Sequence, residues 1–277
     1  YVTTITKFDN PTKSLSQHYV GKRLGEIWGY QVEGLFKTDA EAAEYQAKIN
    51  DRAVNNSVYS CGVAALAKLK AGDVKFVDRN GDGVINTDEN TVGKPGDRYI
   101  IGNSLPRYTY SFRGDIDWYG FNLSVFFQGI GHCDWMPPKT CSYFWSLYGF
   151  PASSFVPTDF ESKTWTEDRR NAYFPRRRGY STYSGAALGV NTDRYLQNAA
   201  YIRLKNITLG YTLPIKQNKA VEKVRIYATG ENLWYWSPMK RHSKYIDPEV
   251  ATASSNQSDD CIYPFSRTVS LGIDITF

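Results

Sequence analysis

Apolar and polar residues alternate along the last twelve positions of the chain, from Ser266 to Phe277. Because successive residues of an extended chain point to opposite faces, the apolar residues share one face and the polar residues share the other. The same period of two occurs at 107–118, 121–129 and 224–229. Each segment is therefore predicted to be a β-strand with one apolar and one polar face.

The alternation changes phase once, within residues 201–213. Ile202 and Leu204 have one parity, whereas Ile207 and the apolar residues that follow have the other. A β-bulge near Asn206 would keep one continuous apolar face. Two shorter strands are the alternative.

Short and long links alternate between the predicted strands. The link at 119–120 and the one after Leu213 are short. The long links span 9–106, 131–199 and 233–264. This rhythm is typical of outer-membrane barrels, whose short periplasmic turns alternate with long extracellular loops. With a further strand at 1–8, the chain is predicted to form an all-β fold, an antiparallel transmembrane β-barrel segment of about six strands.

Strand length and aromatic placement agree with this interpretation. The ten residue steps from Val224 to Trp234, at about 3.3 Å each and tilted by about 40°, cover roughly 25 Å, the height of a barrel's apolar band. Trp234–Trp236 is expected at the outer rim and Trp118–Tyr119 at the inner rim. Six strands are too few to close a barrel. We therefore expect the chain to be part of a larger barrel or to pair with another chain.

Composition narrows the choice of class. Aromatic residues make up 15% of the chain, including 21 tyrosines, and such residues collect where apolar and wet environments meet. No apolar run approaches the 18 residues of a spanning helix. The net charge is +5. Its densest piece, 176–178, is interpreted as a solvated loop, because no nucleic-acid-binding motif accompanies it.

The four cysteines lie far apart in predicted loops and lack the CxxC spacing of zinc sites. They are Cys61, Cys133, Cys141 and Cys261. An oxidising compartment would permit disulfides, but the spacing does not indicate any pairing.

Several stretches together resemble the C-terminal third of the SusC/RagA family of TonB-dependent outer-membrane transporters. They are GEIWGYQVEGLFKTDAEA (25–42), GDVKFVDRNGDGVIN (72–86), IGNSLPRYTYSFRGDIDWYGFNLSVFFQGIG (101–131), YLQNAAYIRLKNITLGYTLP (195–214), IYATGENLWYW (226–236), YIDPEV (245–250) and YPFSRTVSLGIDITF (263–277). Residues 1–277 would then be the C-terminal part of the barrel, without the plug domain.

The resemblance implies a barrel of about 22 strands with an N-terminal plug, in the outer membrane of a Gram-negative bacterium. It also implies import of oligosaccharides or peptides with a SusD-like surface lipoprotein, driven by TonB acting on the absent plug. The other expected contacts are outer-membrane lipid and the rest of the barrel, with no nucleic acid. Phe277 matches the family's C-terminal aromatic, a barrel-assembly signal.

Residues 78–89 match the spacing of an EF-hand calcium loop. The predicted ligands are Asp78, Asn80, Asp82, the Val84 carbonyl, Asn86 and Glu89. Gly83 allows the sharp turn, and hard oxygen ligands suit Ca²⁺. The segment before the loop, 72–77, is expected to be extended rather than helical, so a solvent-facing turn is the alternative. A bound Ca²⁺ would brace an extracellular loop.

No catalytic motif is present, so the protein is predicted not to be an enzyme. The paired carboxylates at 247–249 and 259–260 are interpreted as loop residues. Four residues on polar strand faces are candidates for the barrel lumen: Arg113, Asp115, Arg225 and Tyr227. Loop aromatics could contact sugar rings or could simply pack the loop: Trp135, Tyr143, Trp145 and Tyr148.

The sequence thus favours the barrel wall of a TonB-dependent importer. The alternative is a secreted, calcium-stabilised β-sandwich that binds glycans. A sandwich also alternates, but its loops are short and evenly spaced.

Overall fold

A computed structural model describes residues 1–7, 9–60, 67–152, 154–183, 185–214, 221–253 and 264–277. The chain divides into two compact units. We call 1–105 with 134–197 the loop unit, and 106–133 with 198–253 and 264–277 the sheet unit. Cys61, Cys261 and the carboxylate pair 259–260 lie outside the described residues.

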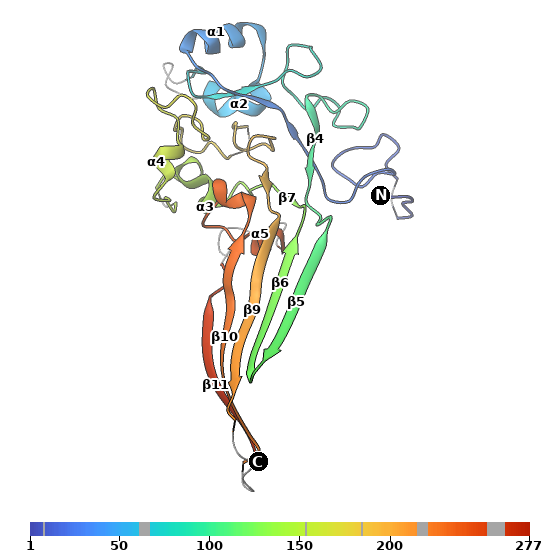
Figure 1. Ribbon diagram of the computed structural model, residues 1–277. Coiled ribbons are helices and arrows are strands. Elements are labelled where there is room, and N and C mark those ends of the chain that lie inside the picture. The colour runs from blue at the N-terminus through green and yellow to red at the C-terminus, as the bar shows by residue number, and fades with distance from the viewer. Residues whose placement is uncertain (8, 61–66, 153, 184, 215–220, 254–263) are drawn as a thin grey trace. The chain divides into compact units, whose positions relative to one another are not determined.

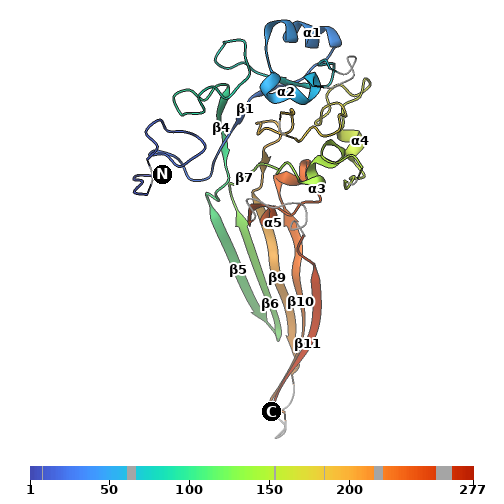
Figure 2. The same ribbon diagram turned by 180° about the vertical axis from the view of Figure 1, so that it is seen from behind.

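The sheet unit contains one antiparallel five-stranded sheet in the order β11-β10-β9-β6-β5 (Figures 1 and 2). Its strands are β5 (Thr109–Trp118), β6 (Phe121–Ile130), β9 (Tyr201–Thr212), β10 (Lys223–Trp236) and β11 (Thr268–Thr276). Two short helices follow β10, η2 (Pro238–Arg241) and α5 (Pro248–Ala253). The fold class predicted from the alternation is confirmed, with strands of 9 to 14 residues. A tilted strand needs about 9–11 residues to cross a bilayer.

A two-residue turn joins β5 to β6. Trp118 pairs with Phe121, which leaves Tyr119 and Gly120 as the turn, both with positive φ (46° and 85°). This is the conformation of the type I′ hairpins that suit the right-handed twist of paired strands. The short link predicted at 119–120 is therefore confirmed as a two-residue hairpin turn.

The predicted bulge is confirmed, with Lys205 as the extra residue. Phe126 pairs with Asn206 and Phe127 pairs with Leu204, so Lys205 has no partner in the register of β6. The register of β10 with β9 shifts at the same place. Ile202 and Leu204 thereby join Ile207 on one face of the sheet.

The apolar face of the sheet is exposed. Across all five strands, register partners on this face are apolar, as in Ile226 opposite Ile273 and Ala228 opposite Leu271. The Leu271 and Ile273 side chains are 83% and 63% exposed. Soluble proteins rarely expose so large a contiguous apolar surface. Within the described residues no second sheet covers this face, so the sandwich alternative lacks its second layer.

Aromatic residues mark both ends of the apolar face. Trp118 and Tyr211 lie at the end formed by the β5–β6 turn, where the Phe121 ring approaches that of Tyr211 at 4.5 Å. At the other end Trp234 and Trp236 are 49% and 54% exposed. This placement agrees with the predicted girdles, in which amphipathic rings occupy the membrane–water interfaces.

One predicted strand does not form. Residues 1–7 have no strand pairing, although the Val2 amide donates to the Lys22 carbonyl (2.9 Å) and the Gly21 amide to the Val2 carbonyl (2.8 Å). These hydrogen bonds pair the Val2 backbone with residues 21 and 22 instead of with a strand of the sheet. The sheet therefore has five of the roughly six predicted strands.

The loop unit has secondary structure and a core of its own, which the prediction of plain loops missed. Its sheets pair β1 (Glu26–Tyr30) with β4 (Arg98–Asn103) and β2 (Val32–Leu35) with β3 (Val74–Phe76), and β7 (Asp134–Trp135) pairs with β8 (Gln197–Asn198). Its helices are α1 (Asp39–Lys48), α2 (Arg52–Tyr59), α3 (Ser142–Trp145), η1 (Ser146–Tyr148) and α4 (Phe160–Lys163).

Local sequence explains α1. The Thr38 hydroxyl accepts the Glu41 amide (3.1 Å), and the Glu41 carboxylate accepts the Lys37 amide (2.8 Å). This is a variant of the capping box in which the Glu41 carboxylate accepts the amide of the residue before the N-cap rather than that of Thr38. It satisfies two amides at the helix start. Ala42, fully buried, faces a small core with Phe36, Val58 and Leu69.

In the described residues, no helix has the length and apolar character that crossing a membrane requires.

The two faces of β11 give a testable asymmetry. We expect Leu271→Arg to destabilise the full-length protein in lipid vesicles by about 2–4 kcal/mol, because it places a charge on the apolar face near the middle of a strand. Ser270→Arg, on the polar face of the same strand, is the matched control and should cost far less. Heat-resistant gel mobility after refolding measures the folded fraction. Equal losses for the two variants would contradict the assignment of faces.

Candidate functional site

All four lumen candidates lie on the polar face of the sheet, in two separate clusters. On β5 the Arg113 guanidinium forms two hydrogen bonds with the Asp115 carboxylate, of 2.9 and 3.2 Å. On β10 the Arg225 guanidinium lies 5.0 Å from the centre of the Tyr227 ring. The strands β6 and β9 separate the clusters. Their exposure to a barrel lumen stays a prediction.

The β10 cluster is a packed arrangement of side chains. Arg225 donates to the Asn122 side chain (3.1 Å from Nε) and to Asp274 on the neighbouring strand (3.3 Å). Gly210 makes room for this contact, since a Cβ there would lie 2.4 Å from the Asn122 oxygen. Tyr227 covers Gly272, where a Cβ would meet its ring at 2.3 Å. An aromatic ring that covers a strand glycine stabilises the sheet, so Tyr227 has a packing role.

A buried charge network near the end of the sheet opposite the β5–β6 turn was not predicted. Arg203 on β9 and Asp247 before α5 are each 1% exposed and form an ion pair, with Nη2 to Oδ2 at 2.5 Å. Arg203 Nε also lies 3.0 Å from Glu249. Lys205, the bulge residue, reaches Glu249 at 2.7 Å. Asp247–Glu249, interpreted as loop carboxylates, therefore anchor the segment after β10 to the polar face.

Aromatic rings complete this network. The Arg203 guanidinium lies 4.7 Å from the Tyr235 ring centre and 5.1 Å from that of Phe265. Rings over a guanidinium replace part of the hydration that burial removes. One feature of the sequence could have indicated the network: the two cations at 203 and 205 have the same spacing as the two carboxylates at 247 and 249. The pattern of the sequence does not show that two segments 44 residues apart lie in contact.

The loop aromatics pack the loop unit. Trp135, Trp145 and Tyr148 are 6%, 1% and 1% exposed, and the Trp145 ring lies 5.3 Å from that of Tyr195. The Tyr195 hydroxyl is fully buried, and this burial raises its pKa to about 12. Tyr143 is partly exposed and contacts the Phe155 ring at 5.0 Å. The packing interpretation therefore holds for three of the four residues.

The 78–89 loop has the local turns that its motif predicts. The Asp78 carboxylate accepts the amides of Gly81 (2.7 Å) and Gly83 (2.8 Å), and Gly83, predicted to allow the sharp turn, has a positive φ of 79°. The preceding segment is strand β3, as expected. Side-chain oxygens of Asn80 and Asp82 likewise accept amides within the loop.

Glu89 is not turned into the loop. Its carboxylate pairs with the exposed Lys94 ammonium. A buried residue beyond the motif, Asp97, accepts the amides of Arg79 (2.8 Å) and Asn86 (2.9 Å) and so closes the loop from outside. Burial raises the pKa of Asp97. Among the described residues, no three His, Cys, Asp or Glu side chains gather as metal ligands. The loop offers oxygens, and Glu89 would have to leave Lys94 to bind a cation.

Cys133 and Cys141 are fully buried. The basic run 176–178 was interpreted as a solvated loop, but only part of it is exposed to solvent. Arg177 is exposed, whereas Arg178 forms a bidentate ion pair with the buried Asp73 at 2.6 and 2.8 Å.

The fold thus defines a class: a stretch of membrane-barrel wall with one lipid-type face and one polar face, carrying folded loops. No family model matches the chain. It is 26% identical over 215 residues to TonB-dependent receptor P26 of Formosa agariphila, covering 74% of this chain and 20% of the relative. It is 25% identical over 211 residues to TonB-dependent receptor SusC of Bacteroides thetaiotaomicron, covering 73% and 17%.

Among solved structures, the chain resembles the RagAB peptide transporter with a TM-score of 0.56 and 20% identity, over 91% of this chain and 22% of the other. The chain spans about a fifth of the length of the curated relatives it matches. The homologues of this chain are TonB-dependent receptors, SusC among them, and the resemblance to the SusC/RagA family is confirmed.

The Arg203 network predicts an asymmetric response to mutation. We expect Arg203→Ala to destabilise the full-length protein by about 3–5 kcal/mol, because it leaves the Asp247 carboxylate buried without a partner. Arg225→Ala, on the same face but partly exposed, should cost much less. Thermal unfolding and protease cleavage within 237–253 measure the effect. Resistance of that segment in Arg203→Ala would contradict the anchoring role.

Proposed function

We propose that the chain forms part of the wall and outer loops of an outer-membrane importer energised through TonB, in a Gram-negative bacterium. The observation that carries this proposal is the five-stranded sheet with an exposed apolar face, a polar opposite face and aromatic residues at both ends of the strands. Such a sheet is stable only where lipid covers one face and closure of the barrel pairs its edges.

The relatives support import as the activity. The matched proteins are named TonB-dependent receptors, and the structure of similar fold is a peptide transporter. On this proposal the substrates are oligosaccharides or peptides, and a SusD-like lipoprotein binds at the extracellular side. The loop unit has a folded core with buried aromatic rings, which agrees with the pre-organised surfaces that most complexes use. The protein has no enzymatic role in this proposal.

Deletion of the gene tests the activity. We expect uptake of a labelled substrate, identified from a panel of oligosaccharides and peptides, to fall to background in the deletion strain. A protonophore should have the same effect in the parent strain, because TonB depends on the proton gradient. Fractionation should recover the full-length protein with the outer membrane. Recovery from the culture medium would instead favour a secreted glycan-binding protein, and undiminished uptake of every substrate would contradict import.

We also propose that the 78–89 loop binds Ca²⁺ and braces the loop unit. The turns around Asp78 and Gly83 already curl the backbone as the motif requires. Asp78, Asn80, Asp82, the Val84 carbonyl, Asn86 and Glu89 would hold the ion. The ion would supply positive charge that draws the carboxylates together. Its removal would leave the loop to its internal hydrogen bonds.

Calorimetric titration of the purified full-length protein with CaCl₂ tests this site. We expect binding that Glu89→Gln weakens about tenfold or more, because a charged ligand is lost. Asp88→Asn changes the same charge at a position that is not a ligand in this spacing, so it should leave the affinity nearly unchanged. No binding at millimolar Ca²⁺ would refute the proposal.

A further inference from the structure

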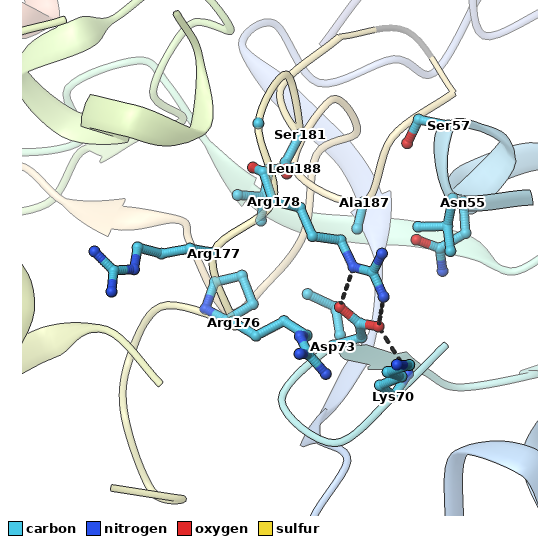
Figure 3. Close-up of a pocket in the computed structure, with 14 residues that line it drawn as sticks. Asn55, Ser57, Lys70, Asp73, Arg176, Arg177, Arg178, Ser181, Ala187 and Leu188 are labelled. Atoms are coloured by element: carbon cyan, nitrogen blue, oxygen red, sulfur yellow. Dashed lines mark hydrogen bonds and ion pairs between the residues drawn. The ribbon is translucent and has the colours of Figure 1, made fainter. Parts of the chain in front are cut away.

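Three adjoining hollows in the loop unit share basic residues. The first has a volume of about 370 Å³ and is shown in Figure 3. The second, of about 380 Å³, shares Lys70 and Arg176 with the first. The third, of about 440 Å³, shares Lys37 and Arg170 with the second. We call the three hollows together the basic groove.

Basic residues outnumber acidic ones along the basic groove, with eight Lys or Arg against five Asp or Glu. Protein cations already engage most of the carboxylates. Asp73 accepts two hydrogen bonds from Arg178 and one from the Lys70 backbone amide (2.8 Å), as Figure 3 shows. Glu33 and Glu41 both pair with Lys75, at 3.1 and 3.0 Å.

Four cations of the basic groove retain hydrogen-bonding capacity. In the part of the chain that the structure describes, the Lys37 and Lys70 ammonium groups have no ion-pair partner. Arg170 Nε donates to the Glu167 carbonyl (3.1 Å), and Arg176 Nη1 donates to the Ala71 carbonyl (3.1 Å). Because a guanidinium has five N–H donors, both arginines retain donors for an anion. These four residues are the ones that the hollows share, so the positive charge runs along the groove.

The apolar lining of the basic groove is concentrated in the first hollow, which includes Val58, Val74, Pro175, Ala187 and Leu188. The second and third hollows offer little to an apolar ligand. In the second hollow the apolar lining residues are Ala71 and Trp165. The Trp165 ring is 7% exposed, because Gly72 packs against it and the Arg176 guanidinium lies 5.6 Å from its centre. In the third, they are Leu35 and Ala172. A peptide gains much of its binding energy from apolar side chains in pockets, and the second and third hollows offer few such contacts.

We propose that the basic groove binds an anionic oligosaccharide, one whose sugars carry carboxylate or sulfate groups. Arginine matches both groups with parallel hydrogen bonds, and lysine adds charge. The repeated charge of such a chain suits a groove with cations in each of its three hollows. This inference rests on the proposed function, since it names the substrate class that the importer would capture on its loops.

Binding to the purified full-length protein tests the inference without a membrane potential. The probe is a fluorescently labelled chondroitin sulfate hexasaccharide, with maltohexaose as the neutral probe and hexaglutamate as the acidic peptide. We expect the sulfated probe to bind most tightly and to weaken as salt rises from about 0.05 to 0.5 M, because the Debye length shortens.

A double variant locates the site. Lys37→Gln with Lys70→Gln should weaken the sulfated probe about tenfold or more, since two charge-assisted contacts are lost. Lys48→Gln with Lys94→Gln removes the same charge from exposed residues outside the groove and should change the affinity less than about twofold. Equal weakening in the two double variants, or equal affinity for maltohexaose, would overturn the site. Tighter binding of hexaglutamate would overturn the ligand class.

The uptake experiment separates this inference from the proposed function. Binding that depends on Lys37 and Lys70 in a protein whose deletion leaves all uptake unchanged would contradict import and leave the groove standing. Uptake that is lost on deletion, combined with no binding of the sulfated probe, would contradict the groove and leave import standing.

Discussion

The structure depends on one constraint: every strand of the five-stranded sheet must keep its apolar residues on one face while its backbone stays in the ladder. A single shift of register would exchange the two faces. β9 meets this constraint with one extra residue, Lys205, which brings Ile202 and Leu204 to the same face as Ile207. The exposed face that results is consistent with lipid as its environment, because no described element covers it.

The bulge also connects the sheet to the segment that follows it. Lys205 and Arg203 both reach Glu249, and Arg203 pairs with the buried Asp247. The bulge residue Lys205 is needed to keep the apolar face continuous. Its ammonium group lies on the polar face, where it helps to hold the segment that carries α5. Desolvating these charges is costly, so the network is better understood as a device that specifies one position for this segment than as a source of stability.

The loop unit has a different physical basis. Its interior consists of packed aromatic rings and small two-stranded sheets, and each of the three hollows of the basic groove has cations in its lining. The aromatic residues that could have been a sugar platform are mostly in that interior. The cations of the basic groove remain accessible to a ligand at the surface of the unit. We therefore expect the unit to recognise its ligand by charge rather than by aromatic stacking. In the proposed importer, the barrel wall therefore inserts into the membrane, and the loop unit captures the substrate.

Period-two alternation was enough to predict the sheet, its two faces, the bulge and the turn at 119–120, because in a membrane strand each residue's environment follows directly from its parity. The same reasoning failed at 1–7, where alternation occurs without a ladder, and in 9–106, where the Thr38–Glu41 capping signal was passed over. It also could not place Asp247 beside Arg203 or bring Lys37, Lys70 and Arg170 along one groove. These contacts join residues tens of positions apart, and only tertiary packing determines which distant charges meet.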